Sequence, residues 1–208
     1  MPCPVDNQRE MNMELKIYYG YFWQGEKVRL RAWQLEDAEK KWREYTDSEA
    51  RSFLQYEMGL PPVALAAYTE QLRPYCDFKD ISANIGFAIE TLAGEFVGWI
   101  NMHSIDRRNG VFGFGVSIFR EHRRKGYAAE AVTILLRYGF YELRMQKCNS
   151  ACLDSNVGSL RLHQSLGFRE EGHRRRVAYL NGRYHDDVLF GLLKEEFDEK
   201  QHPTAQHR

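Results

Sequence analysis

The sequence lacks the features that mark metalloproteins, disulfide-rich proteins and proteins that coat nucleic acid. Its four cysteines are scattered without a Cys-x-x-Cys pair, and no paired histidines stand at metal-ligand spacing, so we expect neither a metal site nor a disulfide framework. Lys and Arg number 29, as do Asp and Glu, whereas binding along nucleic acid needs a large basic excess. Any anion site must therefore be local.

Long apolar runs are also missing. The first twenty residues contain Asp6, Glu10 and Glu14 and no apolar stretch, which is unlike a secretory signal. No segment approaches the roughly 20 apolar residues that a membrane-spanning helix needs. We therefore expect a cytoplasmic protein that has no membrane partner.

The length of 208 residues suits one domain with a sizeable core. Residues 1–24 are irregular and aromatic and are expected to form an N-terminal extension. The domain is expected to span residues 25–197. Residues 198–208 are polar and are expected to form a flexible tail.

The apolar pattern predicts a mixed α/β domain around one sheet. The expected strands are 27–31, 84–91, 95–103, 111–119, 147–153, 169–180 and 184–193. The expected helices are 35–45, 63–75, 126–143 and a short one between Asn156 and Gly167, with a further helical or loop piece at 48–60. The crossover from strand 111–119 to strand 147–153 through the long helix should be parallel.

A basic loop, residues 120–128, joins a predicted strand to the start of the long helix. The first turn of a helix has unpaired N–H groups and the positive end of the helix dipole. Gly126 lets an anion approach the backbone, Ala128 keeps the next contact small, and residues 123–125 add three positive charges. These features predict a phosphate-binding cradle. The alternative is a solvated basic turn that only starts a helix.

Other nucleotide-binding sites fit the sequence less well. No GxxxxGK[ST] run is found, and no GxGxxG follows a predicted strand. These absences speak against a P-loop and against a dinucleotide-binding site of the Rossmann type.

The motif Arg123-x-x-Gly126-x-Ala128, on its strand–loop–helix frame, resembles the acyl-CoA pyrophosphate motif of the GCN5-related N-acetyltransferases. Other segments are similar to the same family in the same order. They are 25–31 with 35–38 for its opening strand and helix, 154–159 with 166–168 for its distal segment, and 181–186 for the last hairpin of the ribosomal-protein alanine and spermidine acetyltransferases. The resemblance covers about residues 25–195.

The resemblance implies an N-acetyltransferase that moves an acetyl group from acetyl-CoA to a primary amine of a small molecule or a protein N-terminus. It implies a single-domain α/β fold whose mixed, mostly antiparallel sheet has a splayed parallel pair and flanking helices. The strand before the cradle should carry a bulge. By this analogy the residues that bind acetyl-CoA are Ile118, Phe119, Arg123, Arg124, Lys125, Gly126, Tyr127, Ala128 and Asn156.

Catalytic residues follow less directly from the resemblance. In much of the family, a tyrosine after the Asn protonates the leaving thiolate, and here His163 stands in its place. Histidine can donate a proton near neutral pH, so His163 is either this general acid or a packed helix residue. For the base, strand 111–119 offers no carboxylate, so Glu90 and Glu57 are the candidates, against ordinary surface charges. Glu130 is expected to be structural because it lies at the helix start.

Two other functions remain compatible with the sequence. One is a non-catalytic sensor of acyl-CoA or another metabolite on the same fold. The other is a nucleic-acid-associated module that uses residues 123–125 and 174–176, against which the neutral charge weighs. Analogy and the aromatic residues of 18–23 suggest a homodimer, because a small domain rarely leaves such a cluster bare.

Overall fold

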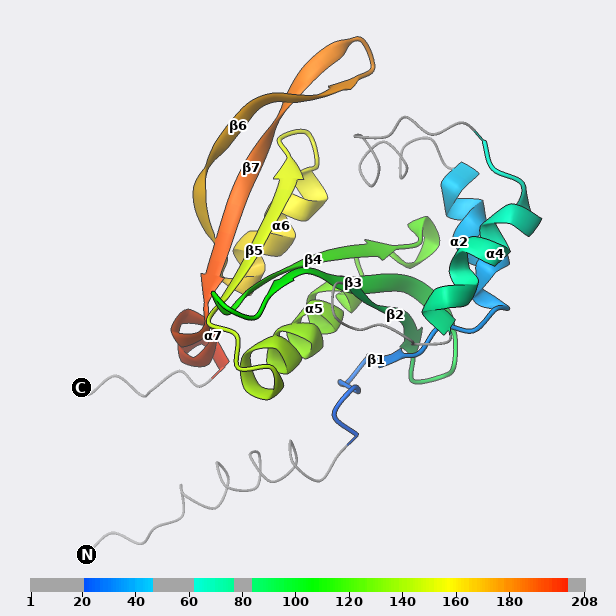
Figure 1. Ribbon diagram of the computed structural model, residues 1–208, viewed down its shortest axis with the longest axis horizontal. Coiled ribbons are helices and arrows are strands. Elements are labelled where there is room, and N and C mark those ends of the chain that lie inside the picture. The colour runs from blue at the N-terminus through cyan, green and yellow to red at the C-terminus, as the bar shows by residue number, and fades with distance from the viewer. Residues whose placement is uncertain (1–20, 47–61, 77–83, 202–208) are drawn as a thin grey trace, which may run out of the picture.

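The computed structural model describes residues 21–46, 62–76 and 84–201, and the description below concerns this part of the chain. Its strands form one seven-stranded sheet in the order β1-β2-β3-β4-β5-β7-β6 (Figure 1). The strands are β1 (Val28–Arg31), β2 (Asn84–Thr91), β3 (Phe96–Asp106), β4 (Val111–Ile118), β5 (Lys147–Leu153), β6 (Arg169–Leu180) and β7 (Arg183–Leu193). The helices are α2 (Asp37–Thr46), α4 (Leu65–Cys76), α5 (Tyr127–Arg137), α6 (Val157–Leu166) and α7 (Lys194–Gln201).

The expected strands and helices are confirmed, with differences at their ends. The expected piece at 48–60 lies outside the described residues. The long helix departs most from expectation, because its α-helical part ends at Arg137 and a π-helical turn, η2 (Tyr138–Glu142), continues it. A short 3-10 helix, η1 (Arg120–His122), follows β4.

Strands β4 and β5 form a parallel pair that lasts for only three residues. Pairing joins Val111–Gly113 to Lys147–Asn149, and the strands then diverge. The other neighbours in the described sheet pair antiparallel. The predicted mixed sheet with a splayed parallel pair is therefore confirmed.

The bulge expected in the strand before the cradle is not found in β4. Its register with β3 runs unbroken from Ile118 opposite Gly98 to Gly113 opposite His103. The irregularity in this pairing lies between His103 and Asp106 of β3, opposite the part of β4 that runs from Val111 to Gly113.

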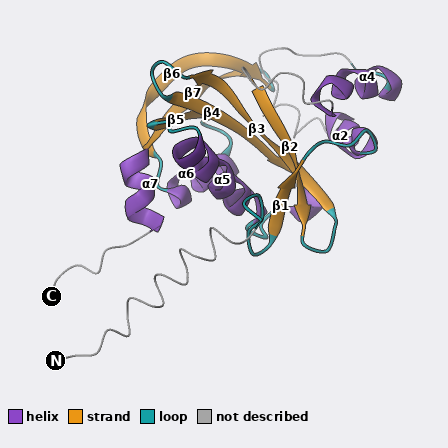
Figure 2. Ribbon diagram, turned by 60° about the horizontal axis from the view of Figure 1, so that its bottom comes forward, coloured by secondary structure: helices purple, strands orange, loops and turns teal. Residues whose placement is uncertain are grey.

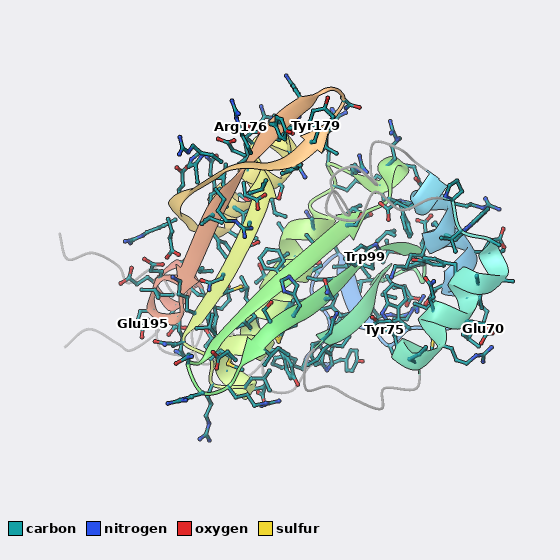
Figure 3. All side chains as sticks on the ribbon, turned by 45° about the horizontal axis from the view of Figure 1, so that its top comes forward. Glu70, Tyr75, Trp99, Arg176, Tyr179 and Glu195 are labelled. Atoms are coloured by element: carbon teal, nitrogen blue, oxygen red, sulfur yellow. The ribbon has the colours of Figure 1, made fainter. Side chains whose placement is uncertain are left out.

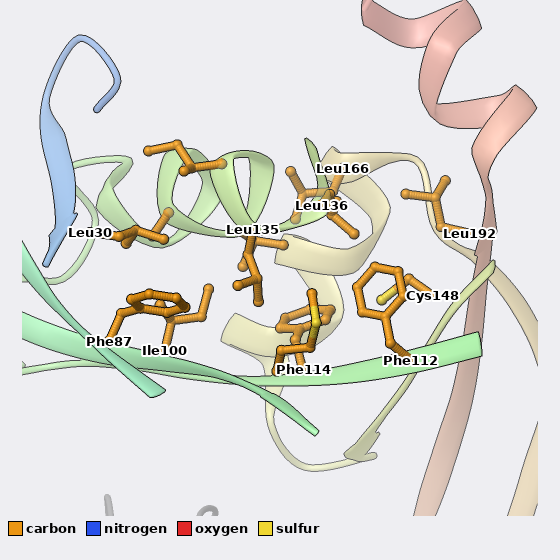
Figure 4. Packing of buried hydrophobic residues seen from close by; sticks show 14 of the residues in the cluster. Leu30, Phe87, Ile100, Phe112, Phe114, Leu135, Leu136, Cys148, Leu166 and Leu192 are labelled. Atoms are coloured by element: carbon orange, nitrogen blue, oxygen red, sulfur yellow. The ribbon is translucent and has the colours of Figure 1, made fainter. Parts of the chain in front are cut away.

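Helices cover both faces of the sheet (Figure 2). On one face, α5 and α6 bury the main core, where Leu135 and Leu136 of α5 meet Phe112 and Phe114 of β4 (Figure 4). On the other face, α2 and α4 pack a smaller cluster that includes Trp33 and Leu72. Successive side chains of a strand point to opposite faces of the sheet, and the strands carry apolar side chains on both faces. Each face is therefore covered by helices.

The C-terminal boundary is further along the chain than the sequence analysis expected. Helix α7 runs to Gln201, so residues 198–201 are helical and do not belong to a flexible tail. Phe197 is buried against Phe140, and Asp198 accepts a hydrogen bond from the Tyr141 hydroxyl at 2.8 Å. These contacts hold the helix against η2.

The N-terminal boundary also shifts. Trp23 packs on Phe87 and Tyr138, with ring centroids 4.8 and 4.7 Å apart, and its carbonyl accepts the Leu30 N–H. Phe22 contacts Trp23 at 5.3 Å. The described end of the aromatic segment therefore belongs to the domain, which weakens the argument from that cluster for a homodimer; residues 18–20 lie outside the described residues.

Glu130 fastens the start of the sheet to the start of α5. Its carboxylate accepts the backbone N–H groups of Glu26, Lys27 and Val28 at 2.7, 2.8 and 2.7 Å. Glu130 lies in the first turn of α5, where a negative charge also favours the helix dipole. Its expected structural role is confirmed.

We predict that Glu130→Ala lowers the free energy of unfolding by about 2 kcal/mol, because hydrogen bonds to a charged acceptor contribute about 1.5–3 kcal/mol when they are shielded from water and these are only partly shielded. Chemical denaturation measures the change. The matched control, Glu142→Ala at an exposed position, should change it by less than about 0.5 kcal/mol. Equal effects of the two substitutions would contradict the fastening role.

Candidate active site

A groove of about 840 Å³ opens where β4 and β5 diverge. It is bounded by the end of β4, the loop before α5, the start of α5 and the start of α6. Its lining residues are Val116, Ser117, Ile118, His122, Arg123, Arg124, Gly126, Tyr127, Ala128, Ala129, Ser155, Asn156, Val157, Gly158, Ser159, Arg161, Leu162 and Ser165. The predicted cradle is therefore one wall of a larger groove.

The loop before α5 turns through two left-handed residues, Arg124 with φ of 62° and Gly126 with φ of 85°. Gly126 precedes the helix without a side-chain cap, and the first helical bond runs from the Glu130 N–H to the Gly126 carbonyl. The N–H groups of residues 127–129 are thus left without partners inside the helix. They line the groove and form a place for an anion.

A second helix begins at the same groove. Asn156 precedes α6 and its Oδ1 accepts the Ser159 N–H at 3.1 Å, so the predicted N-cap is confirmed. This bond occupies the amide oxygen and leaves the amide N–H donors for a ligand. Because the starts of α5 and α6 both line the groove, the positive ends of two helix dipoles favour a negative ligand there.

The structure brings together most of the residues expected to bind acetyl-CoA. Those that line the groove are Ile118, Arg123, Arg124, Gly126, Tyr127, Ala128 and Asn156. The Arg123 side chain folds back, and its Nε donates to the Ile118 carbonyl at 3.0 Å. Lys125 is exposed and does not line the groove, and its carbonyl accepts Lys27 Nζ at 3.4 Å.

The expectation for Phe119 is wrong, because both of its backbone groups are already bonded. Its N–H donates to the Val97 carbonyl at 3.0 Å, and its carbonyl accepts the His122 N–H at 2.8 Å. Successive residues of a strand direct their backbone groups to opposite neighbours, so Ile118 faces the side where β5 diverges. Of this pair only Ile118 can meet a ligand with its backbone, and it does so through its N–H, because its carbonyl accepts Arg123 Nε.

Ser155 leaves a hydrogen-bonding group unused inside the groove. Its Oγ is buried and has no hydrogen-bond partner among the described residues. A buried hydroxyl without a partner costs free energy, and a polar group of a ligand can supply that partner. The lining of the groove therefore fits a ligand that is anionic at one end and polar along its length.

A second cavity, of about 610 Å³, lies on the other face of the sheet. It is formed by α2, α4 and the strands β2 and β3, and Figure 3 shows Trp99 and Tyr75 on this side. The lining residues are Trp33, Lys41, Glu44, Tyr68, Gln71, Leu72, Pro74, Tyr75, Asn84, Gly86, Trp99, Ile100 and Asn101. Aromatic rings and a few polar groups thus share its walls.

Two charged residues of α2, Lys41 and Glu44, were not among the residues that the sequence analysis singled out. Lys41 Nζ lies over the rings of Trp33 and Trp99, 4.3 and 4.8 Å from their centroids. Burial lowers the pKa of Lys41 to about 8, although the nearby charges of Glu44 and Asp37 oppose the change. Their helical spacing could have singled them out, because Lys41 and Glu44 lie on the same face of the helix as Asp37 and Ala38, which are buried.

His163 is buried beneath the groove and does not line it. Its Nδ1 lies 2.8 Å from the Ser159 carbonyl and its Nε2 lies 2.8 Å from Ser150 Oγ, so both ring nitrogens are engaged. The ring stacks on Phe190 at 4.6 Å. The expected direction of His163 toward the cofactor is therefore wrong, and its place is that of the alternative, a packed helix residue.

Of the two carboxylates expected as the base, Glu90 lies within the described residues and does not line the groove. Glu90 binds two arginines, accepting Arg29 Nε at 2.6 Å and Arg31 Nε at 2.7 Å. Burial tends to raise the pKa of Glu90, but these two partners hold it below its ordinary value. Glu90 lines neither cavity and acts as an ion-pair partner between β1 and β2. Glu57 lies outside the described residues.

We predict that His163→Ala lowers the free energy of unfolding by about 2–4 kcal/mol, because it leaves a cavity in the core. Turnover per folded molecule should stay within about threefold of wild type, whereas loss of a general acid costs about 10²–10⁴-fold. Thermal melting and steady-state kinetics, measured on the same variant, distinguish a structural role of His163 from a catalytic one. A well-folded variant with the larger loss would restore the catalytic role.

The pH dependence of stability gives an independent check. Burial lowers the pKa of His163, so the unfolded chain binds this proton more readily than the folded protein. Stability should therefore fall as pH drops below about 6.5, the ordinary imidazole value. His163→Ala should lose less stability over this range than wild type, while the fall due to His103, whose pKa burial also lowers, should remain.

Two features are missing from the described residues. None of their helices is long and apolar enough to cross a membrane. They also contain no group of three His, Cys, Asp or Glu side chains placed to hold a metal ion.

Known proteins are similar to this chain over most of its length. The SPbeta prophage-derived uncharacterized N-acetyltransferase YokL of Bacillus subtilis (strain 168) is 33% identical over 177 residues, which cover 85% of this chain and 96% of that protein. The spermidine N(1)-acetyltransferase of Vibrio cholerae serotype O1 (strain ATCC 39315 / El Tor Inaba N16961) is 27% identical over 53% of this chain and 64% of its own length.

Structural comparison supports the same fold. The crystal structure of spermidine N-acetyltransferase from Vibrio cholerae in complex with CoA and spermine superposes with a TM-score of 0.72 at 22% identity, over 82% of this chain and 97% of that one. A family model described as an acetyltransferase (GNAT) domain matches residues 27–169. The chain therefore belongs to the GNAT family of acetyltransferases, as the cradle around Gly126 had indicated.

Proposed function

We propose that acetyl-CoA binds in the groove between β4 and α6, and that the amine approaches the thioester from the cavity under α2 and α4. The chain is an acetyl-CoA-dependent N-acetyltransferase that acts on amines. This assignment rests on one observation: the first turns of α5 and α6 line the same groove, at the point where β4 and β5 diverge.

The pyrophosphate is assigned to the start of α5. The N–H groups of residues 127–129 have no partners in the helix, and Gly126 carries no side chain that would keep a phosphate from the backbone. Arg124 and Arg161 line the same groove from opposite walls and add positive charge. No metal ion is needed in this arrangement, since helix amides and guanidinium groups can hold both phosphates.

The pantetheine arm is assigned to the open edge of β4. Beyond Gly113 the edge of β4 that faces β5 has no strand partner in the described sheet, so the Ile118 N–H can donate to an amide oxygen of the arm. The Asn156 amide and the Ser155 hydroxyl supply further donors along the opposite wall. The thioester then reaches the end of β4 nearest the second cavity.

The acceptor is assigned to the cavity of Trp33, Trp99 and Glu44. Lys41 Nζ already lies over the rings of Trp33 and Trp99, so these rings are left to pack against the apolar body of an acceptor, and the one carboxylate of the described lining can pair with one amine. Relatives include spermidine acetyltransferases, but the described lining carries Lys41 beside Glu44 and so holds no acidic cluster for a polycation. We therefore favour a monoamine or a protein N-terminus over a polyamine.

Two earlier expectations stay predictions. A homodimer would be seen as a doubled mass by light scattering at micromolar concentration. The cytoplasmic location follows only from the sequence pattern, and cell fractionation tests it.

We predict that Gly126→Val weakens CoA binding by about 10- to 100-fold, or about 1.4–2.7 kcal/mol. A branched residue is strained at φ of 85° and its Cβ would lie 2.9 Å from Lys27 Nζ, so the loop that presents the N–H groups would have to shift. Calorimetry with CoA measures the change. Gly94→Val is the matched control: Gly94 has φ of 87°, against 85° at Gly126, and lies in the turn after β2. Unchanged affinity in a folded Gly126→Val protein would refute the assignment.

A panel of acceptors tests the proposed chemistry. Release of the CoA thiol is followed with acetyl-CoA and 2-phenylethylamine, the peptide Ala-Ala-Ala or spermidine. We expect 2-phenylethylamine or the peptide to exceed spermidine by at least about tenfold in kcat/KM, since the cavity offers one carboxylate for one amine. Spermidine as the best acceptor would overturn the choice of amine, and tight CoA binding without thiol release would favour the sensor.

A further inference from the structure

The groove and the cavity meet at a hydrogen bond between a serine and a glutamate. Ser117, near the end of β4, lines the groove, and Glu44, near the end of α2, lines the cavity. The Ser117 hydroxyl donates to Glu44 Oε1 at 2.6 Å. The Glu44 carboxylate therefore lies at the border between the two spaces.

A second donor fixes the other carboxylate oxygen. The indole Nε1–H of Trp99, on β3, donates to Glu44 Oε2 at 3.3 Å. Donors on two adjacent strands thus set the orientation of the carboxylate. An ionised carboxylate can accept about four hydrogen bonds, so Glu44 can still accept one from a ligand in the cavity.

Glu44 is the one carboxylate of the described residues that lines either space. Asp37, on the same face of α2, is held by both terminal nitrogens of Arg31 at 2.7 and 2.8 Å. Glu90 is held by two arginines, as described above. The described lining of the cavity therefore offers a single proton acceptor of this kind.

The surroundings of Glu44 suit proton transfer. Burial raises the pKa of Glu44 above its ordinary value, and the hydrogen bonds from Ser117 and Trp99 only partly offset this. The charged groups that face it are Arg123, from the loop after β4, and Lys41, on its own helix, and both favour the ionised form. A base is most effective when its pKa lies near the working pH.

We propose that Glu44 is the general base that takes a proton from the attacking amine, and that Ser117 and Trp99 are the positioning residues that orient it. The proposal rests on the proposed placement of acetyl-CoA in the groove and of the amine in the cavity. The neutral amine nitrogen attacks the thioester carbonyl carbon. The N–C bond forms, the C–S bond breaks, and the sulfur leaves as CoA thiolate. One N–H proton passes to the Glu44 carboxylate, which later releases it to water in the open cavity.

The first test is Glu44→Gln, which keeps the shape of the side chain and one of its two accepting oxygens, and removes the base. With the fastest acceptor among 2-phenylethylamine, Ala-Ala-Ala and spermidine, kcat should fall by about 10²–10⁴-fold. CoA affinity by calorimetry should stay within about threefold, because Glu44 acts on the amine in the transition state. Thermal melting shows that the variant is folded.

The pH profile gives a readout that a purely structural role would not move. The base must be ionised, so wild-type kcat rises as pH rises through the pKa of Glu44, and Glu44→Gln should lose this limb. The bond from Ser117 lowers that pKa, so Ser117→Ala should move the limb to higher pH. Ser117→Thr keeps the hydroxyl and should retain the wild-type limb.

Glu39→Gln is the matched control, because Glu39 is exposed on α2 and pairs with Arg43 away from both spaces. It should leave kcat and the pH profile unchanged. If wild type turns over and a folded Glu44→Gln keeps kcat within about threefold with the same acid limb, Glu44 is not the base and the proposed function stands. If wild type releases no thiol with any of the three amines, the proposed function and the role of Glu44 both fail.

Discussion

The divergence of β4 from β5 is the constraint on which the rest of the structure depends. Pairing ends at Gly113 and Asn149, so beyond this point the described β4 has a backbone edge that only a side chain or a ligand can satisfy. The same divergence opens the sheet between its two helical layers. Acetyl donor and amine can therefore meet at Ser117 from opposite faces, which a continuous sheet would prevent. Glu130 supports this arrangement, because it fixes the start of α5 to β1 beside the opening.

The anion-binding end could be predicted from the sequence because its physics is local. A left-handed residue before a helix calls for glycine, and Gly126 has φ of 85°. An Asn before a short helix caps it through its own side chain, as Asn156 does. Both statements need only a few neighbouring residues. The splay of the parallel pair was available only through resemblance, because no residue of β4 or β5 by itself specifies where pairing stops.

The catalytic assignments depended on packing, and the sequence could not settle them. His163 has the spacing of a groove residue, but Ser150 and Phe190, which are distant in sequence, engage its ring in the core. From the sequence, Glu90 is expected to be an ordinary surface charge. It is buried because Arg29 and Arg31 of the neighbouring strand surround it. Glu44 reaches the border between the cavity and the groove only because α2 packs across the sheet over Trp99, a contact that helical spacing alone does not predict.

Hydrogen–deuterium exchange with and without CoA tests the central claim most directly, since a ligand that bonds open backbone groups slows their exchange. CoA should protect peptides covering residues 114–129 and 155–162, and should leave the turns at 92–94 and 181–182 unchanged. These segments are the edge of β4, the two helix starts and two hairpin turns that lie outside the groove. Protection confined to other segments, or none at saturating CoA, would contradict the account.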